Sequence, residues 1–190
     1  MSKLDRDKWD RRYADSSYRR GNPVTLLQEW LPRLAVGKAL DVACGAGRNA
    51  IAMARAGFRV DAIDISGIGL ELARKEAASL DLDINWIEHD LEQPYDFDTD
   101  YDLIVVLWYV NLPLIARLGE CLKPGGYLLC EEHLVAGGEL AGPENPRFRV
   151  APGALETAAE GLDVMLYEET ASTNDNGEPM ASARLVARKP

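Results

Sequence analysis

The sequence contains few cysteines and histidines. Its 190 residues include only three cysteines and two histidines. Cys44, Cys121 and Cys130 are odd in number and form no Cys-x-x-Cys pair, which predicts reduced thiols rather than a disulfide scaffold. No group of histidines, cysteines and acids has the spacing of a ligand set, so we expect no metal site.

Positive charge is also scarce, because the formal net charge is −10. Binding to nucleic acid or to an anionic membrane depends on Lys and Arg, so neither is an expected partner. The longest apolar run, residues 103–110, is too short to span a bilayer. Residues 1–21 are charged and have no apolar core, so we expect no secretory signal and a cytoplasmic protein. A local basic patch still allows an anionic small molecule as partner.

Strand and helix patterns alternate along the chain, which predicts an α/β fold with a Rossmann-like, doubly wound, mostly parallel sheet and helices on both faces. The expected helices cover residues 4–15, 25–34, 48–56, 68–80, 111–122 and 154–160. The expected strands cover residues 38–43, 58–63, 84–90, 101–110, 127–135, 162–169 and 182–189. The turn at 174–177 (Asn-Asp-Asn-Gly) predicts a closing hairpin with an antiparallel strand.

The length predicts one domain, residues 1–190. We expect residues 1–36 to form a helical cap. Residues 137–153 are rich in glycine and proline and read as a long loop on the substrate side, because such loops inside compact domains are usually functional or mobile.

The segment Asp41–Asn49 joins an apolar strand to a helix through Gly45 and Gly47. Glycine at these positions allows a sharp turn and close approach of a ligand, and the helix N-terminus beyond offers free N–H groups. The spacing Gly45-x-Gly47-x-x-Ala50 also matches the dinucleotide fingerprint. The turn alone therefore leaves a nicotinamide cofactor open.

Acidic residues at the ends of three predicted strands narrow the choice of cofactor. Asp41 comes just before the turn and suits a cationic ligand group better than a pyrophosphate, although it also reads as a structural cap of the turn. Asp64 ends the second strand, where an acceptor for ribose hydroxyls is expected. Asp90 ends the third strand and reads either as an acceptor for an exocyclic amino group or as an ordinary polar strand end.

Several segments resemble class I S-adenosylmethionine-dependent methyltransferases: DVACGAGRNAIAMARAGFRVDAIDIS and the Pro-Gly-Gly turn of LKPGGYLLCEEH. CGAGRN, WDRRYAD and NPRFRVAPGALETAAEGLDVMLYEE resemble the tellurite-resistance and thiopurine-type branch. The resemblance covers nearly the whole chain. It implies a seven-stranded sheet with an antiparallel last strand, and S-adenosylmethionine as cofactor.

The resemblance also implies cofactor contacts. The glycines are expected to lie along the amino acid part of S-adenosylmethionine, and Asp41 is expected to face its ammonium group. Asp64 is expected to bind the ribose and Asp90 the adenine. The full implied set is Trp9, Tyr13, Asp41, Ala43, Gly45, Gly47, Arg48, Asn49, Asp64, Ile65, Asp90, Leu91 and Val106.

The acceptor is expected beyond the strands at 101–110 and 127–135. His133 is the candidate base, because its ordinary pKa lies near working pH, but a lone histidine is more often structural. Arg147 and Arg149 suit an anionic acceptor, or else pair with surface acids such as Glu144 and Glu156. The expected function is methyl transfer to a small, soft or anionic acceptor such as tellurite, selenite or a thiol. The alternatives are a nicotinamide-dependent oxidoreductase and a non-catalytic S-adenosylmethionine-binding protein.

Overall fold

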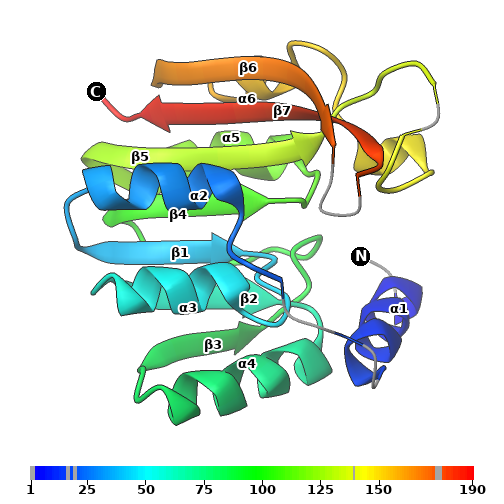
Figure 1. Ribbon diagram of the computed structural model, residues 1–190. Helices are drawn as coiled ribbons and strands as arrows, with labels where there is room; N and C mark the ends of the chain where they lie inside the picture. The colour runs from blue at the N-terminus through cyan, green and yellow to red at the C-terminus, as the bar shows by residue number, and fades with distance from the viewer. Residues whose placement is uncertain (1–2, 16–17, 19–20, 139, 174–176) are drawn as a thin grey trace. The chain divides into compact units, whose positions relative to one another are not determined.

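Seven strands form one sheet in the order β3-β2-β1-β4-β5-β7-β6 (Figure 1). The computed structural model describes residues 3–15, 18, 21–138, 140–173 and 177–190. The chain divides into two compact units, Met1–Asp102 and Leu103–Pro190. The expectation of a single domain stays a prediction.

The first unit carries the glycine turn. Its elements are α1 (Lys3–Ala14), α2 (Thr25–Trp30), the 3-10 helix η1 (Leu31–Arg33), β1 (Lys38–Val42), α3 (Arg48–Arg55), β2 (Arg59–Asp64), α4 (Gly67–Ser79) and β3 (Ile84–Glu88). β1, β2 and β3 are parallel. α3 and α4 pack on these strands, and the side chains between them, such as Leu40, Ile63 and Leu70, are fully buried.

The second unit carries the antiparallel strand. β4 (Tyr101–Leu107) crosses the boundary between the units, and the elements after it are α5 (Leu112–Glu120), β5 (Leu122–His133), the 3-10 helix η2 (Pro146–Phe148), α6 (Ala154–Ala158), β6 (Asp163–Thr173) and β7 (Pro179–Arg188). β7 runs antiparallel to both β5 and β6. The predicted fold class is thus confirmed, while residues 174–176 of the expected turn lie outside the described residues.

One local expectation was wrong. The helix expected at 111–122 ends at Glu120, and residues 123–126 begin β5 instead of merely stopping the helix. The reason is that the start of β5 pairs with the residue that follows β7. Gly125 N donates to Lys189 O at 2.8 Å, and Lys189 N donates to Gly126 O at 2.9 Å. The described residues of the loop expected at 137–153 contain only the short helix η2 and, at Val150, one bridge to Leu134.

Gly47 shows why the turn needs glycine. Its φ is +79°, and a Cβ there would lie 2.7 Å from Trp86 Cη2 and 2.8 Å from the Cβ of Ala73. Trp86 comes from β3 and Ala73 from α4, so Gly47 lets the start of α3 pack closely against both elements. Packing inside the protein therefore requires glycine at position 47, whether or not a ligand binds.

We expect Gly47→Ala to lower the free energy of unfolding by about 2–4 kcal/mol, from steric overlap together with left-handed strain. Urea unfolding followed by circular dichroism measures this loss. Gly153→Ala is the matched control, because φ is +77° there but no atom lies within 4 Å of the added Cβ. That control should lose only about 1 kcal/mol. Equal losses in the two variants would show that packing against Trp86 is unimportant.

Candidate functional site

Asp64, the last residue of β2, binds two segments of backbone at once. Its Oδ2 accepts from Gly45 N at 2.8 Å, and its Oδ1 accepts from Ser66 N at 2.8 Å. Burial raises the pKa of Asp64, and these backbone hydrogen bonds oppose the rise. The carboxylate therefore joins the glycine turn after β1 to the start of α4.

The turn itself is held in left-handed backbone conformations. The φ angles are +54° at Ala43, +57° at Gly45 and +79° at Gly47. The Cβ of Ala43 makes its conformation unfavourable by about 1–2 kcal/mol, a strain that the sequence pattern did not reveal. Cys44 N donates to Ile63 O at 3.0 Å, which fixes the strained turn against β2.

Asp41 is a buried acid, and the nearby charge of Arg48 offsets only part of the rise that burial causes in its pKa. It lies on β1 and is 1% exposed. Among the described residues, its Oδ2 has no hydrogen-bond partner, while the carboxyl group accepts from the backbone of Ala50. Burial raises the pKa of Asp41 to about 7. An unsatisfied buried oxygen of this kind suits a ligand that supplies a positive charge or a donor.

The helix α1 lies against the glycine turn. A Cβ on Gly45 would overlap the hydroxyl of Tyr13, and a Cβ on Gly69 would lie 2.9 Å from Tyr13 Cδ2. The ring of Trp9 stacks on Tyr13 with centroids 6.0 Å apart. Burial and the nearby Asp64 raise the pKa of the Tyr13 hydroxyl. Both predicted aromatic residues are thus on α1, and Tyr13 directly faces the turn.

Sequence reasoning missed the residues that fasten α1. Ser66 Oγ donates to Asp10 Oδ1 at 2.5 Å, and Ile68 N donates to the same oxygen at 3.4 Å. Asp10 therefore lies at the N-terminus of α4, where a carboxylate is stabilised by the helix dipole. The only available signal was its place within WDRRYAD.

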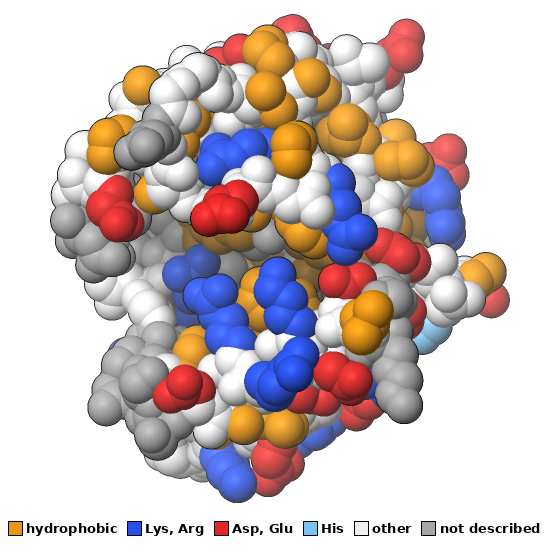
Figure 2. Space-filling view, turned by 90° about the vertical axis from the view of Figure 1, so that its right-hand side faces the viewer, with side chains coloured by type: hydrophobic (Ala, Val, Ile, Leu, Met, Phe, Trp, Pro, Cys, Tyr) orange, Lys and Arg blue, Asp and Glu red, His pale blue; other side chains and the backbone are white. Residues whose placement is uncertain are grey.

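The outer surface of α1 is basic. Its exposed cationic side chains are those of Arg6, Lys8, Arg11 and Arg12. Figure 2 shows several Lys and Arg side chains close together on the face of the molecule that it draws. This local concentration contrasts with the net charge of −10 of the chain.

Arg48 and Asn49 open α3 as expected, but their side chains bind protein backbone. Asn49 Oδ1 accepts from Val24 N at 3.0 Å, and Arg48 donates to Asn22 O at 3.4 Å. Asn49 is 5% exposed. Both side chains thereby hold the segment that leads into α2.

The residues predicted around an adenine lie near the end of β2. His89 N donates to Asp64 O at 2.9 Å, which brings the segment after β3 beside Asp64. Asp90 Oδ1 accepts from Glu92 N at 3.0 Å. Leu91 and Ile65 are both buried. The first unit thus brings together twelve of the thirteen predicted cofactor contacts; Val106 is the exception, fully buried on β4 in the second unit.

His133 ends β5 in the second unit. Its ring packs on that of Trp108, with centroids 4.5 Å apart and an interplanar angle of 38°. Burial, together with the charge of Arg149, lowers the pKa of His133 to about 4. The imidazole is therefore neutral near pH 7, and it is a weaker base than an ordinary histidine.

The two predicted arginines differ in what they bind. Arg149 donates to four backbone carbonyls, those of Leu134, Leu140, Ala141 and Pro143. The guanidinium of Arg147 lies over the ring of Phe148, 4.5 Å from its centroid. Arg149 is thus an organiser of the loop, while the exposed side chain of Arg147 sits on its outside.

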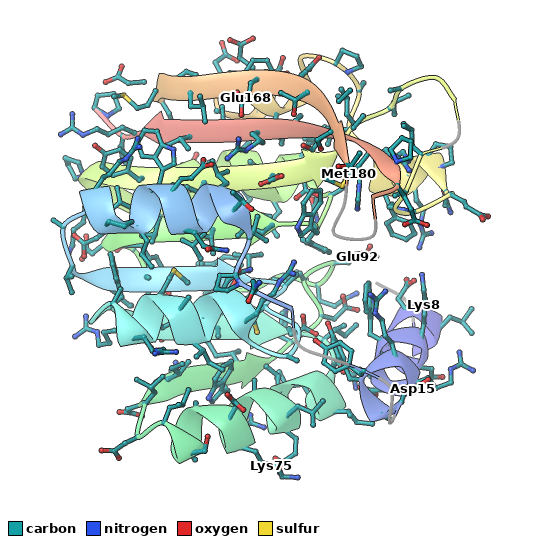
Figure 3. All side chains as sticks on the ribbon, viewed as in Figure 1. Lys8, Asp15, Lys75, Glu92, Glu168 and Met180 are labelled. Atoms are coloured by element: carbon teal, nitrogen blue, oxygen red, sulfur yellow. The ribbon has the colours of Figure 1, made fainter. Side chains whose placement is uncertain are left out.

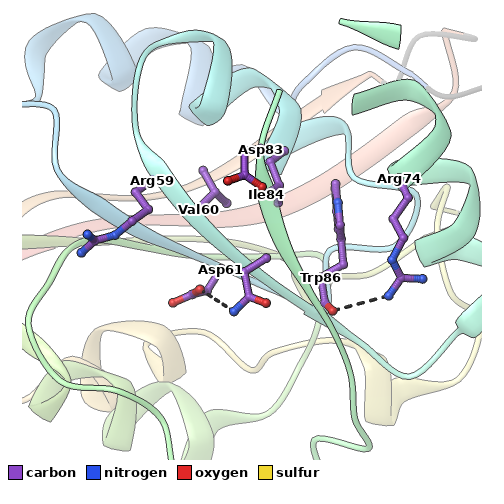
Figure 4. A pocket seen from close by; sticks show the side chains of 8 residues that line it. Arg59, Val60, Asp61, Arg74, Asp83, Ile84 and Trp86 are labelled. Atoms are coloured by element: carbon purple, nitrogen blue, oxygen red, sulfur yellow. Dashed lines mark hydrogen bonds between the residues drawn. The ribbon is translucent and has the colours of Figure 1, made fainter. Parts of the chain in front are cut away.

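A cavity of about 430 Å³ in the first unit is lined by Arg59, Val60, Asp61, Arg74, Asp83, Ile84, Asn85 and Trp86 (Figure 4). Arg59 and Ile84 begin β2 and β3, whereas the glycine turn and Asp64 lie at the carboxyl ends of β1 and β2. In parallel sheets of this kind ligands bind at the carboxyl ends. The cavity therefore lies at the other end of these strands from the glycine turn, where the cofactor is predicted to bind.

Comparisons with known proteins identify the family. A family model described as "Methyltransferase domain" matches residues 39–126. The cypemycin N-terminal methyltransferase of Streptomyces sp is 32% identical over 173 residues, which cover 78% of this chain and 69% of that protein. The chain belongs to the class I S-adenosylmethionine-dependent methyltransferases.

Other relatives agree with this assignment. The ubiquinone biosynthesis O-methyltransferase of Erwinia tasmaniensis is 30% identical over 128 residues, covering 62% of this chain and 52% of that protein. This chain thus spans about half the length of that relative, and 37% of the length of the BioCD protein of Bordetella avium.

Solved structures share the fold. TehB from Haemophilus influenzae has a TM-score of 0.76 at 21% identity, over 97% of this chain and 67% of that chain. The N-methyltransferase NodS from Bradyrhizobium japonicum WM9, in complex with S-adenosyl-L-homocysteine, has a TM-score of 0.68 at 19% identity, over 97% of this chain and 98% of that chain.

Membership of the methyltransferase family decides between the cofactors that the glycine turn left open. S-adenosylmethionine is the cofactor, and the nicotinamide alternative is not retained. The residues present fit it, because the Oδ2 of Asp41, which has no hydrogen-bond partner among the described residues, suits an ammonium group. No helix in the described parts of this methyltransferase is long and apolar enough to cross a membrane.

The raised pKa of Asp41 predicts a pH-dependent stability of the free protein. The folded state holds the proton more tightly than the unfolded state, so this contribution is full below about pH 4 and is lost as the pH rises through about 7. Asp41→Asn removes the charge and keeps an acceptor oxygen. It should be more stable than the wild type by about 1–3 kcal/mol at pH 8, and by much less at pH 4.

Urea unfolding of both proteins at pH 4, 6 and 8 tests this expectation. The Asp61→Asn variant is the control, because Asp61 lies on β2 but is ion-paired with Lys38 at 3.3 Å. A stability difference between Asp41→Asn and the wild type that does not grow with pH would contradict the assigned burial of a neutral acid.

Proposed function

We propose that this methyltransferase acts on a small-molecule acceptor that is already nucleophilic at neutral pH, such as a chalcogen oxyanion or a thiol. When bound, S-adenosylmethionine supplies a methyl group on a positively charged sulfur, a good leaving group, so orientation of the acceptor carries much of the rate. A proton-bearing, hard acceptor would additionally need a base.

The observation that carries the proposal is the weakness of the bases at the end of β5. His133, the predicted base, has its pKa lowered to about 4 by burial and by Arg149. Glu132 is fully buried, and burial raises its pKa well above the ordinary range. His133 is a weak base, and Glu132 is enclosed in the protein with one carboxyl oxygen bound to Tyr109 N. An acceptor that must lose a proton receives little help from either, whereas a soft anion needs none.

We further propose the division of labour in cofactor binding. Asp41 binds the ammonium, Gly45 and Gly47 approach the amino acid part, and Tyr13 with Trp9 closes over it. Asp64 binds the ribose, and Asp90 with Leu91 binds the adenine. Supporting this proposal, the described residues of the first unit place Tyr13 on Gly45 and the segment after β3 beside Asp64.

Arg147 is our candidate for recognition of the acceptor's charge. Arg149, its companion in the sequence prediction, already donates to four carbonyls and has little capacity left. Arg147 lies at the surface of the loop, where a guanidinium can meet an oxyanion.

A methyl-transfer screen tests the function. Tellurite, selenite, small thiols, halides and small carboxylates, together with a phenol and an amine as hard, proton-bearing acceptors, are each offered with S-adenosylmethionine, and formation of S-adenosylhomocysteine is measured. We expect turnover with a soft or anionic acceptor. Silence across the screen, while calorimetry still shows S-adenosylhomocysteine binding, would support the alternative of a non-catalytic binding protein. Turnover confined to hard, proton-bearing acceptors would contradict the proposal.

With the acceptor that emerges, Arg147→Ala should raise the acceptor KM about tenfold, as expected for a lost charge-assisted contact of about 1.4 kcal/mol. The Kd for S-adenosylhomocysteine should not change. Arg188→Ala is the matched control, because Arg188 is exposed and lies opposite Tyr127 in the strand register, six residues before His133 on β5. An unchanged KM, or equal losses of acceptor and cofactor binding, would remove Arg147 from the acceptor site.

A further inference from the structure

Two consecutive glutamates on β5 have opposite surroundings. Glu131 meets a cation, because Arg184 Nε lies 3.7 Å from its Oε2, and Arg184 also binds Glu168, labelled on β6 in Figure 3, at 2.6 Å. Glu132 points to the other face, as neighbours on a strand do. It is fully buried, and among the described residues its Oε2 has no hydrogen-bond partner.

The other oxygen of Glu132 has a specific partner outside the sheet. Tyr109 N, two residues beyond the end of β4, donates to Glu132 Oε1 at 3.0 Å. The preceding amide is held as well, since Trp108 N donates to Glu131 O at 2.8 Å. Two successive amides of the segment after β4 are therefore bound by two successive residues of β5.

This double attachment holds a strained backbone. Trp108 has a φ of +67°, in the left-handed region that a bulky residue rarely adopts. Such a conformation persists only where its surroundings over-determine it. The consequence is a fixed direction for the Trp108 ring, which packs on His133 at 4.5 Å. The His133 ring also borders the long loop, since a Cβ on Gly142 would lie 2.5 Å from His133 Cε1.

We propose that Glu132 is a positioning residue of this methyltransferase, which acts through the amide of Tyr109 to hold Trp108 against His133 on the acceptor side. The link to the acceptor rests on the proposed function; the positioning does not. Glu132 is more than a space filler, because an apolar side chain would fill the same volume without leaving an oxygen unsatisfied. Burial raises the pKa of Glu132, and the hydrogen bond from Tyr109 N opposes that rise.

Histidine titration tests the positioning without any acceptor. The chain has only His89 and His133, so NMR follows both rings, with His89 as an internal reference. Glu132→Leu removes the acceptor for Tyr109 N and keeps an apolar volume, so Trp108 should leave the ring. Solvation should then raise the pKa of His133 by at least about one unit toward its ordinary value. Glu132→Gln keeps an acceptor oxygen and should titrate like the wild type.

The matched control is Glu131→Gln, which alters the neighbouring buried acid but leaves its backbone carbonyl bound to Trp108 N. It should leave the His133 titration unchanged. An unchanged titration in Glu132→Leu, or an equal shift in Glu132→Gln, would overturn the proposal. If Glu132→Leu does not fold, hydrogen exchange of the wild type is measured instead. The amide of Tyr109 should be protected from exchange, and free exchange of this amide would contradict the proposal.

Kinetics then separate this proposal from the proposed function. With an acceptor found by the screen, Glu132→Leu should lower kcat/KM about 100-fold through misplacement of the acceptor. The Kd for S-adenosylhomocysteine should stay unchanged, and Glu132→Gln should restore turnover. If the His133 titration shifts but turnover does not, the hydrogen bond positions Trp108 as stated and the proposed acceptor site is wrong.

Discussion

The carboxylate of Asp64 is the group on whose hydrogen bonds the first unit depends. It accepts one hydrogen bond from Gly45, after β1, and one from Ser66, before α4. Ser66 in turn binds Asp10, so α1 is tied to the same point. Without this carboxylate, the left-handed turn, the start of α4 and the aromatic residues of α1 would lose their common anchor, since buried backbone donors need a partner.

Buried acids mark the functional parts of this methyltransferase. Asp41 and Glu132 each keep an oxygen without a partner among the described residues, and burial raises the pKa of both. Such groups are unfavourable for stability unless a ligand or a specific contact uses them. Glu131 Oε2 also lacks a hydrogen bond, but it differs from them because Arg184 Nε lies 3.7 Å away and compensates its charge. The contrast explains why we assign Asp41 to the cofactor and Glu132 to the segment that carries Trp108.

In the long loop, two arginines that look alike in the sequence have different contacts in the structure. Arg147 and Arg149 are equivalent in the sequence, where both suit an anionic ligand. In the fold, Arg149 binds four carbonyls around residues 134–143 and so shapes the loop. It also helps keep His133 neutral through its charge. These surroundings are the basis of our proposal that this region orients a nucleophile that needs no base.

The sequence by itself determined the α/β class, the strand and helix order, the glycine turn and the acids at 41 and 64. These features depend on residues close together in the chain, so turn residues and the spacing of apolar residues are enough to predict them. Only the tertiary structure decided that residues 123–126 extend β5, that Tyr109 amide meets Glu132, and that His133 is a weak base. Each of these depends on burial or on a partner more than ten residues away, brought near by strand pairing, and no local pattern records such a partner.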